Sequence, residues 1–367
     1  MKICYLSNSA IPSSVASSIQ IIKMCEAFSE LDNEVTLITT NVKKLKYETF
    51  SFYKVKKKFS IVRMKNFTKF PLGVNYYLFS FLSILESFKF KPDIYITRNF
   101  FTSFLLILFR KKTIIELHHD ISIESRIVKI LVKYFKFLNS KYINKAIAIT
   151  EGVKTEYVKN KYILNNKVIV LPSGSSLKQK KQKLVKKNFL KIGYFGSLYK
   201  SRGLDLIIKL AKIDKKNQYF VYGNLDNLNF MKHKISTENL NFFKFAPYKE
   251  ISSKMSEMDV LIIPYVSSIT VAGDVGDITK YTSPLKLFDY LTTGKVIMCS
   301  DFKILKEVVN NKNVIFVKNF KNPFAWKMEL QKLIPQFERK LIYSLNNQKL
   351  SKNFTLRERA KKILNLS

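Results

Sequence analysis

Short apolar segments alternate with helical segments along this chain, and this alternation constrains its fold more than any other feature. Six segments of the first half are predicted strands, and Ser17–Glu30 has apolar residues near helical spacing. The six are Lys2–Leu6, Glu34–Thr39, Asp93–Thr97, Thr113–Leu117, Ala146–Thr150 and Lys167–Leu171. Repeated strand–helix–strand units predict a parallel sheet that is covered by helices on both faces.

The alternation restarts after a polar, basic stretch. Residues 173–191 contain seven Lys and no acidic residue, which is typical of a linker. The strands predicted beyond it are Lys191–Phe195, Gln218–Tyr222, Asp259–Ile263, Lys295–Cys299 and Asn313–Val317, with helices at Leu204–Lys212, Pro323–Ile342 and Leu356–Leu366. A chain of 367 residues exceeds what one core usually supports.

Two Rossmann-like α/β domains that face each other across a cleft are therefore predicted. We expect a first domain at 1–172, a linker at 173–190, a second domain at 191–345, and a C-terminal helix within 346–367 that packs back on the first domain.

The net charge of +37 indicates anionic partners such as nucleic acid, lipid or phosphorylated ligands. The basic residues are spread over both halves, however, and no nucleic-acid-binding motif is present. This spread favours a general compositional bias, so we expect no nucleic-acid partner.

The cysteines and the apolar runs indicate a cytoplasmic protein. Cys4, Cys25 and Cys299 are odd in number and far apart, with neither metal-site spacing nor a disulfide framework. The start of the chain has no signal-peptide pattern, and no apolar run reaches about 18 residues.

Candidate ligand-binding residues follow the first strand of the second half. Parallel α/β sheets bind ligands at the carboxyl ends of their strands. Gly196 there allows a tight turn and the close approach of a ligand, and Arg202 precedes a helix, where a cation can hold a phosphate. An arginine at a helix start is equally often only solvated.

The segment YTSPLKLFDYLTTGK at 281–295 gives a stronger signal. Ser283 is a suitable N-cap and Pro284 suits the first helical turn, so the amides of Ser283, Leu285 and Lys286 would point out of the helix start. Together with the helix dipole, these amides form a site for a diphosphate.

One turn further along the same helix lies Asp289, whose carboxylate could accept both hydroxyls of a ribose. The alternative is a carboxylate on the helix surface. Gly294 is predicted to end the helix.

These segments resemble the retaining GT-B glycosyltransferases of family 4, also called glycosyl transferases group 1. SPLKLFDYLTTGKVIMCSD at 283–301 resembles their signature SPxKxFEYxAxGxPxIxS. The supporting resemblances are GYFGSLYKSRGLDLII at 193–208, DVLIIPY at 259–265, the first strand, helix and second strand at 1–39, PDIYITR at 92–98 and IIELHHD at 114–120.

The resemblance implies roles for individual residues. Asp289 stands where these enzymes place a ribose-binding Glu, Arg202 where they place a diphosphate-binding cation, and His118 where many place a histidine near the sugar. This sequence departs from the pattern with Tyr281 in place of a Glu and Ser197 in place of an Arg.

Contacts to the donor sugar must therefore differ in part from the family pattern. The candidates are backbone amides and the acidic loop Asp274–Asp277. His118 has a plainer alternative as an ordinary histidine at a strand end.

The implied reaction moves a sugar from a UDP- or GDP-sugar to a cell-surface glycan, a lipid-linked acceptor or a polysaccharide, with retention of configuration. Arg202, Lys286 and the helix start would stabilise the diphosphate leaving group, so neither a metal nor another cofactor is expected. Two other classes stay open: a sugar-nucleotide epimerase of the same fold and a basic nucleic-acid-binding protein.

Two features suggest where the acceptor side lies. Ser13 and Ser14, in the first strand–helix loop, are either acceptor or phosphate contacts or simple turn residues. Within the predicted helix Ser125–Leu138, a basic stripe opposes an apolar face, as in interfacial helices. The stripe consists of Arg126, Lys129, Lys133 and Lys136.

With the basic cluster Lys54–Lys58, this stripe predicts reversible association with an anionic membrane surface. The alternative is a sheet-covering helix with a solvated basic face.

Overall fold

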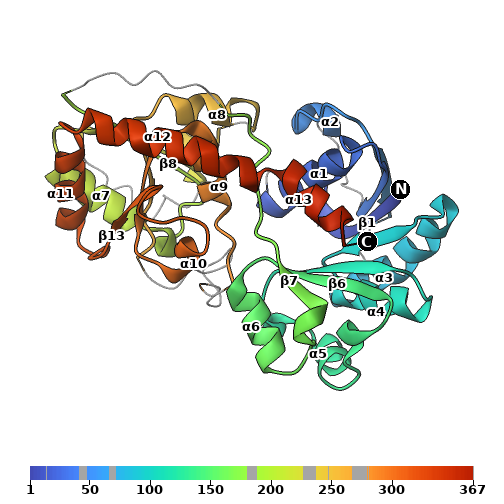
Figure 1. Cartoon of the computed structure of the whole chain (residues 1–367). Helices are drawn as coiled ribbons and strands as arrows, with labels where there is room; N and C mark the ends of the chain where they lie inside the picture. The colour runs from blue at the N-terminus through green and yellow to red at the C-terminus, as the bar shows by residue number, and fades with distance from the viewer. Residues whose placement is uncertain are drawn as a thin grey trace. The chain divides into compact units, whose positions relative to one another are not determined.

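The computed structural model describes residues 1–13, 15–40, 48–65, 72–179, 188–225, 237–246, 248–266, 279 and 281–366. The chain forms two compact units, each built on its own sheet (Figure 1). Unit 1 comprises Met1–Pro172 and Leu356–Ser367, and unit 2 comprises Ser173–Thr355.

Unit 1 is a parallel sheet with strand order β3-β2-β1-β4-β5-β6-β7. Its strands are β1 (Lys2–Ala10), β2 (Glu34–Thr40), β3 (Ser60–Met64), β4 (Ile94–Thr97), β5 (Thr113–Leu117), β6 (Ile143–Ala148) and β7 (Val168–Val170). Its helices are α1 (Ala16–Ser29), α2 (Thr49–Phe52), α3 (Leu72–Ser87), α4 (Phe100–Leu108), α5 (Arg126–Lys133), α6 (Glu151–Lys159) and α13 (Leu356–Leu364). The central strands are apolar and fully buried, as a sheet covered on both faces requires.

The last helix of the chain belongs to the first unit. Leu356, Ala360 and Ile363 recur at helical spacing on α13 and join the core formed around α1 and the sheet of unit 1. Figure 1 shows α13 in red beside α1 in blue. The chain therefore closes the core of unit 1 with residues from its C-terminus.

Unit 2 is a parallel sheet with strand order β10-β9-β8-β11-β12-β13. Its strands are β8 (Lys191–Phe195), β9 (Gln218–Gly223), β10 (Leu240–Lys244), β11 (Val260–Ile263), β12 (Val296–Ser300) and β13 (Val314–Val317). Its helices are α7 (Leu204–Ile213), α8 (Tyr248–Ser256), α9 (Leu285–Thr293), α10 (Lys303–Lys306), α11 (Pro323–Leu333) and α12 (Phe337–Ser351).

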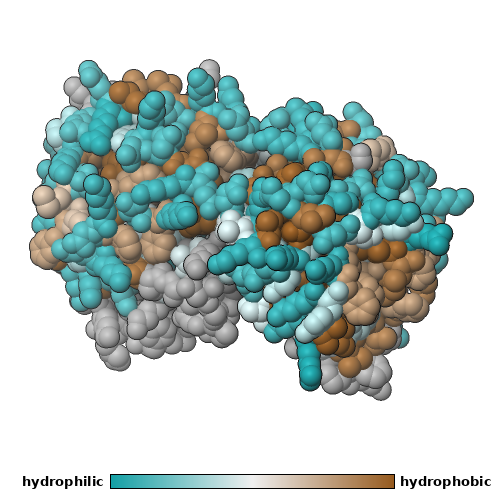
Figure 2. Space-filling model, turned by 60° about the horizontal axis from the view of Figure 1, so that its bottom comes forward, coloured by the Kyte–Doolittle hydropathy of each residue, from teal (hydrophilic) through white to brown (hydrophobic). Residues whose placement is uncertain are grey.

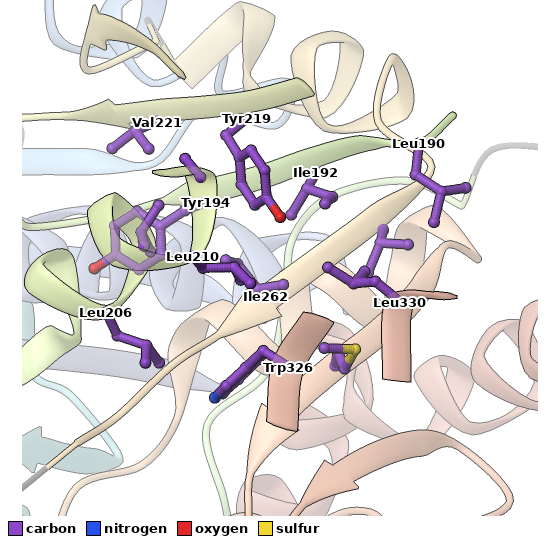
Figure 3. Packing of buried hydrophobic residues seen from close by; sticks show 14 of the residues in the cluster. Leu190, Ile192, Tyr194, Leu206, Leu210, Tyr219, Val221, Ile262, Trp326 and Leu330 are labelled. Carbon is purple, nitrogen blue, oxygen red and sulfur yellow. The ribbon is translucent and has the colours of Figure 1, made fainter. Parts of the chain in front are cut away.

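Apolar side chains fill both faces of the second sheet. On one face, Trp326 and Leu330 of α11 pack with Leu206 and Leu210 of α7 against the strands (Figure 3). On the other face, helices α8 and α9 contribute a second cluster, which includes the buried Tyr290. These layers fix the carboxyl edge of the sheet, where the candidate site lies.

Two expected domain boundaries differ from the structure. The boundary at 345/346 falls inside α12, because that helix continues without a break to Ser351. The expected linker at 173–190 is partly packed: Ser173 and Ser175 are buried in unit 2, and Leu190 joins its core. Residues 180–187 of this stretch lie outside the described part of the chain.

Two strands were not predicted. β3 and β10 lie at the edges of their sheets, and their side chains are mostly exposed or only partly buried. Edge strands carry a weaker apolar pattern than central strands, because one side of the strand has no neighbour.

None of the described helices is long and apolar enough to cross a membrane. Cys4, Cys25 and Cys299 are buried free thiols.

Candidate functional site

The candidate site of unit 2 begins where β8 ends. Gly196 has a φ of +151°, which side-chain-bearing residues rarely adopt, and a Cβ atom there would collide with the side chain of Lys286. Gly196 therefore lets the lysine of α9 lie directly against the turn after β8.

The buried side chain of Tyr194 holds the ammonium group of Lys286. Its Nζ donates a 2.7 Å hydrogen bond to the hydroxyl of Tyr194 and lies 4.2 Å from the centroid of that ring. The Tyr194 hydroxyl in turn donates to the carbonyl oxygen of Ser197 at 2.7 Å. None of the described carboxylates forms an ion pair with Lys286.

The pKa of Lys286 lies well below its ordinary value, because the ammonium is buried and because the positive charge of Arg202 is close. A nearby anion would oppose both effects on the pKa. The pair is therefore a candidate anion site at the carboxyl edge of the sheet.

The backbone after β11 positions Arg202. Its guanidinium lies 5.6 Å from the ring centroid of the buried Tyr265, and a short 3₁₀ turn, Lys200–Arg202, carries it. Gly203 follows with a φ of +86°, and a Cβ atom there would overlap the carbonyl oxygen of Pro264. This close packing joins the loop after β8 to the loop after β11.

The start of α9 differs from the prediction. The helix begins at Leu285 with Pro284 as N-cap, and Ser283 does not cap it. The Ser283 hydroxyl is buried and accepts a 3.2 Å hydrogen bond from the amide of Ser173, which competes with capping. The Leu285 amide is also engaged, by the carbonyl oxygen of Ser283 at 2.9 Å.

One turn into α9, the Asp289 carboxylate is held from within unit 2. Ser175 Oγ donates to Asp289 Oδ1 at 2.6 Å. Burial raises the pKa of Asp289 to about 6, and the Ser175 hydrogen bond opposes that rise. The carboxylate is therefore oriented and is ionised at neutral pH.

Another sequence candidate, Tyr281, is partly buried two residues before Ser283. Thr282, which the sequence analysis did not single out, has its Oγ1 buried without a hydrogen-bond partner among the described residues. Asp274 and Asp277 lie outside the described residues. The structure thus brings Gly196, Arg202, Lys286 and Asp289 to one edge of one sheet.

In unit 1, His118 directly follows β5, at the carboxyl edge of that sheet. Its Nε2 lies 3.6 Å from Glu116 Oε2, too far for a hydrogen bond, and is buried without a partner among the described residues. Burial and the charge of Arg98 lower the pKa of His118 to about 4, so the ring is neutral at pH 7.

A network of charges that the sequence analysis did not identify lies beside His118. Glu116 is fully buried and accepts hydrogen bonds from Tyr5 and Arg98, both at 2.9 Å, and from Arg359 of α13. The cations hold the pKa of this carboxyl well below its ordinary value, although burial opposes them. Arg98 ends the segment 92–98, whose apolar pattern indicated only a strand.

The first strand–helix loop favours the turn interpretation for Ser13. The hydroxyl of Ser13 accepts a hydrogen bond from the Val15 amide at 3.2 Å, and its backbone is fixed by the hydroxyl of Tyr53. Ser14 lies outside the described residues. An acceptor or phosphate contact at either serine stays a prediction.

The predicted basic helix is shorter than expected. α5 ends at Lys133, and Lys136 lies beyond it with a φ of +45°, so Lys136 is not part of a helical stripe. The apolar face expected for this helix is only partly the buried one; the expected residues were Ile127, Ile130, Leu131, Tyr134 and Leu138. Val128, Leu131 and Val132 are buried, while Ile127 and Ile130 are exposed beside Arg126 and Lys133.

Among the described residues, no group of three or more His, Cys, Asp or Glu side chains could hold a metal ion. The independence of metal stays a prediction.

Sequence comparison finds a similarity that covers most of unit 2. Residues 175–349 match the model of the family described as Glycosyl transferases group 1. No curated protein gives a significant match to this chain.

Solved structures share the fold over the whole chain. A glycosyltransferase from Rickettsia africae is 14% identical, with a TM-score of 0.73, over 100% of this chain and 97% of that chain. Alr3699/HepE from Anabaena, in complex with UDP and glucose, is 13% identical with a TM-score of 0.71, over 100% and 99%. Sucrose-phosphate synthase from Thermosynechococcus elongatus is 12% identical with a TM-score of 0.73, over 100% and 98%.

These neighbours have the GT-B fold, which consists of two parallel-sheet α/β domains with additional helices. The chain shares this fold, as the sequence predicted. The family match and the fold together identify the chain as a glycosyltransferase, a transferase of class EC 2.4.

Proposed function

We propose that this enzyme transfers a sugar from a nucleoside diphosphate sugar to a glycan, a lipid-linked or a polysaccharide acceptor, with retention of configuration. The observation that carries the proposal is the buried Lys286 with Arg202 close by, at the carboxyl edge of the second sheet. Burial, and after it the positive charge of Arg202, holds the pKa of Lys286 well below its ordinary value. A diphosphate complements this charge, and Asp289 lies one helical turn away as the acceptor for ribose hydroxyls.

The residues of the two units would have different roles during sugar transfer. Negative charge develops on the diphosphate as the bond to the sugar breaks, and fixed cations that are already in place stabilise it without reorganisation. Lys286 is held by Tyr194 and Arg202 lies over Tyr265, so both side chains are held in place before the donor binds, and the anionic donor favours the charged form of Lys286. His118 serves as a neutral hydrogen-bonding group for the sugar in this scheme.

The proposed donor is a uridine or guanosine diphosphate sugar. Anabaena HepE has been solved with UDP-glucose, which favours uridine as the first base to test. A thermal-shift panel of UDP-, GDP-, ADP- and CMP-sugars on the full chain tests the donor. Stabilisation by none of these compounds would contradict the proposal.

An assay of nucleotide release from the nucleotide sugar that stabilises the protein, with and without sugar acceptors, distinguishes a glycosyltransferase from an epimerase. Acceptor-dependent release of the nucleotide with formation of a glycoside supports transfer, and NMR of the product's anomeric proton tests retention. Interconversion of the nucleotide sugar without an acceptor would instead indicate an epimerase.

The reaction is proposed to need no metal, because Lys286 and Arg202 supply the charge that a divalent cation supplies elsewhere. Activity that is lost in EDTA and restored by Mg²⁺ or Mn²⁺ would contradict this part of the proposal.

We also infer that unit 1 associates reversibly with the anionic, cytoplasmic face of a membrane, where a lipid-linked acceptor would be found. Exposed apolar side chains surround the exposed cations Arg126 and Lys133 and the half-buried Lys129. These apolar residues are Ile123, Ile127, Ile130, Tyr134 and Phe135. Apolar groups among cations suit the interface of an anionic bilayer. Apolar residues also reach the surface among hydrophilic ones on the face drawn in Figure 2.

A further inference from the structure

Arg98 lies directly after β4, at the carboxyl edge of the sheet in unit 1. Its Nε donates hydrogen bonds to Glu116 Oε2 at 2.9 Å and to the Tyr5 hydroxyl at 3.1 Å. Within the described part of the chain, no residue accepts a hydrogen bond from its two Nη atoms. The side chain is 19% exposed, and neither Nη atom is among the buried polar atoms of the described residues that lack a partner, so this end of the guanidinium is accessible to a ligand.

The charges around Arg98 do not balance. Glu116 is one carboxylate, and two guanidiniums, Arg98 and Arg359, are bonded to it. Arg359 is fully committed, because its Nη2 donates to Glu116 and its Nη1 donates to the carbonyl oxygens of Leu171 and Pro172. The cluster therefore retains one positive charge, on the side of Arg98.

No neighbouring group removes this charge. Tyr5 is buried, and its burial raises the pKa of its hydroxyl well above the ordinary value, so it stays neutral. The ring of His118 is neutral as well, partly because the same guanidinium opposes its protonation. A partly buried cluster of two guanidiniums and one carboxylate keeps one uncompensated positive charge, which is costly, and an anionic ligand would compensate it.

A purely structural role does not account for Arg98. Arg359 alone already supplies a counterion for Glu116, and it also ties α13 to the end of the first sheet. The second guanidinium adds a positive charge beyond the one that neutralises Glu116. Its free end presents two nitrogen atoms in the planar arrangement that binds carboxylate or phosphate through two parallel hydrogen bonds.

We propose that the Nη atoms of Arg98 bind a carboxylate or phosphate group of the acceptor, so that the enzyme takes an anionic acceptor. Parallel α/β sheets bind ligands at this edge, and His118 lies at the end of the neighbouring strand. The assignment to the acceptor rests on the proposed glycosyl transfer, whereas the anion site itself rests only on unit 1.

The anion site can be tested on the full chain without any activity assay. The chain has three histidines, so the ring protons of His118 can be assigned by comparison with His118→Gln. Inorganic phosphate bound at Arg98 would offset the guanidinium charge, and the pKa of His118 should then rise from about 4 in an NMR titration. Acetate should act in the same direction.

Variants separate the site from a general effect of salt. Arg98→Gln should abolish the phosphate-dependent shift of His118, and Arg98→Lys, which keeps the charge without the planar fork, should weaken it. Arg110→Gln removes an exposed arginine of the same unit and should leave the shift intact. Circular dichroism of each variant checks that the fold is retained.

The source of the anion is decided with matched acceptors. A glucoside, the corresponding glucuronide and a sugar phosphate differ mainly in charge. Arg98→Lys should raise KM for the charged acceptors by roughly ten- to hundredfold, as expected when a charged hydrogen bond is lost, with little effect on the neutral one. Preference for the glucuronide or for the phosphate identifies the natural group.

Three outcomes would each overturn one part: the anion site, its assignment to the acceptor, or the proposed function. If UDP binds but phosphate does not shift His118, the anion site is wrong and the proposed function stands. If UDP abolishes the effect of phosphate and Arg98→Lys weakens UDP binding, the anion belongs to the donor and the acceptor assignment is wrong. If phosphate binds but no nucleotide sugar does, the proposed function fails and the site remains.

Discussion

Ser175 Oγ donates a 2.6 Å hydrogen bond to Oδ1 of Asp289, which joins the segment that opens unit 2 to the helix of the candidate donor site. Ser175 is buried, and its Oγ also accepts a hydrogen bond from the Leu177 amide at 3.0 Å. One oxygen of the carboxylate is thus fixed, and Oδ2 makes no hydrogen bond with the described residues. The serine therefore fixes the orientation of the Asp289 carboxylate, as the proposed ribose contact requires.

Replacement of Asp289 should weaken nucleotide binding. Asp289→Ala removes the proposed ribose contact, which is worth about 1.5–3 kcal/mol for a hydrogen bond to a charged group. Calorimetry with a UDP-sugar measures the change. Glu338→Ala, an exposed carboxylate on α12, is the control and should bind as the wild type does. Unchanged affinity in Asp289→Ala would contradict the ribose assignment.

The pH dependence of binding tests the same carboxylate. Its pKa is raised to about 6 by burial, so it is ionised above that pH and protonated below it. Affinity for the UDP-sugar should fall as pH drops through about 6, because protonation removes an acceptor, and Asp289→Ala should lose this dependence. The raised pKa also means that the folded state binds this proton more tightly than the unfolded chain, so the contribution of Asp289 to stability is lost as pH rises from its ordinary pKa of 3.8 to about 6.

Binding of the diphosphate should be accompanied by proton uptake at Lys286. The pKa of this lysine is depressed by burial and by Arg202, and an anion beside it would raise that pKa. Calorimetry in buffers of different ionisation enthalpy measures the protons taken up. Lys286→Met should remove the uptake and weaken binding, whereas Lys209→Met, at an exposed position on α7, should do neither. Buffer-independent heats in the wild type would contradict the prediction.

Apolar patterns predicted the central strands of both sheets because those strands are buried on both faces. The helix end at Gly294 was also predicted, and the structure confirms it with Gly294 as a left-handed C-cap. The edge strands β3 and β10 and the long helix α12 were not predicted correctly. The two strands carry mostly exposed or partly buried side chains, and α12 buries polar residues such as Lys340 and Asn347, so the apolar pattern alone places their ends poorly.

The site was predictable only where local sequence determines it. Gly196, Lys286 and Asp289 follow from the strand end and from the spacing on one helix. The capping role of Ser283 was wrong, because its hydroxyl bonds to Ser173, which is 110 residues away in the chain. Arg98, Glu116 and Arg359 form a network through contacts up to 243 residues apart, and no local signal reveals them.

Membrane association should depend on both the charges and the apolar side chains near α5. Arg126→Gln with Lys133→Gln removes two cations, each worth about 1 kcal/mol near an anionic surface, so binding should fall roughly thirtyfold. Tyr134→Ser with Phe135→Ser should weaken it separately. Flotation with anionic and neutral vesicles measures both effects.

The matched control for membrane binding is Lys159→Gln with Lys161→Gln, two exposed lysines elsewhere in unit 1. Added salt should reduce binding of the wild type to anionic vesicles. Equal recovery with neutral and anionic vesicles would remove the electrostatic part of the proposal.

Arg359 should stabilise unit 1 selectively. Arg359→Met breaks a buried ion pair with Glu116, which typically costs about 3–5 kcal/mol, and the remaining partner Arg98 should keep the loss near the lower value. The chain has one tryptophan, Trp326, in the core of unit 2, so its fluorescence reports that unit, while circular dichroism reports both.

The variant should therefore shift the urea transition seen by circular dichroism more than the one seen by fluorescence. Arg357→Met, an exposed neighbour on α13, is the control and should shift neither. Equal shifts by both probes would show that Arg359 does not act on unit 1 alone.

Replacement of His118 should impair turnover rather than donor binding. The neutral ring can hydrogen-bond a sugar hydroxyl, and such contacts matter most when they tighten in the transition state. His118→Ala should lower the rate by roughly ten- to a thousandfold, the range for single polar contacts of this kind. Affinity for UDP should barely change, because the proposed nucleotide site consists of residues from unit 2.

His119→Ala is the internal control, because successive residues of an extended strand end point to opposite sides. In the structure His119 is occupied locally, with Nδ1 2.9 Å from the carbonyl oxygen of Asp120 and Nε2 3.3 Å from Glu124. Its loss should affect stability more than turnover, which thermal melting can measure. If His119 proves to be the sensitive residue, the assignment along the strand is wrong by one residue. If neither histidine matters in a folded enzyme, the role of unit 1 in the chemistry must be assigned to other residues at its sheet edge.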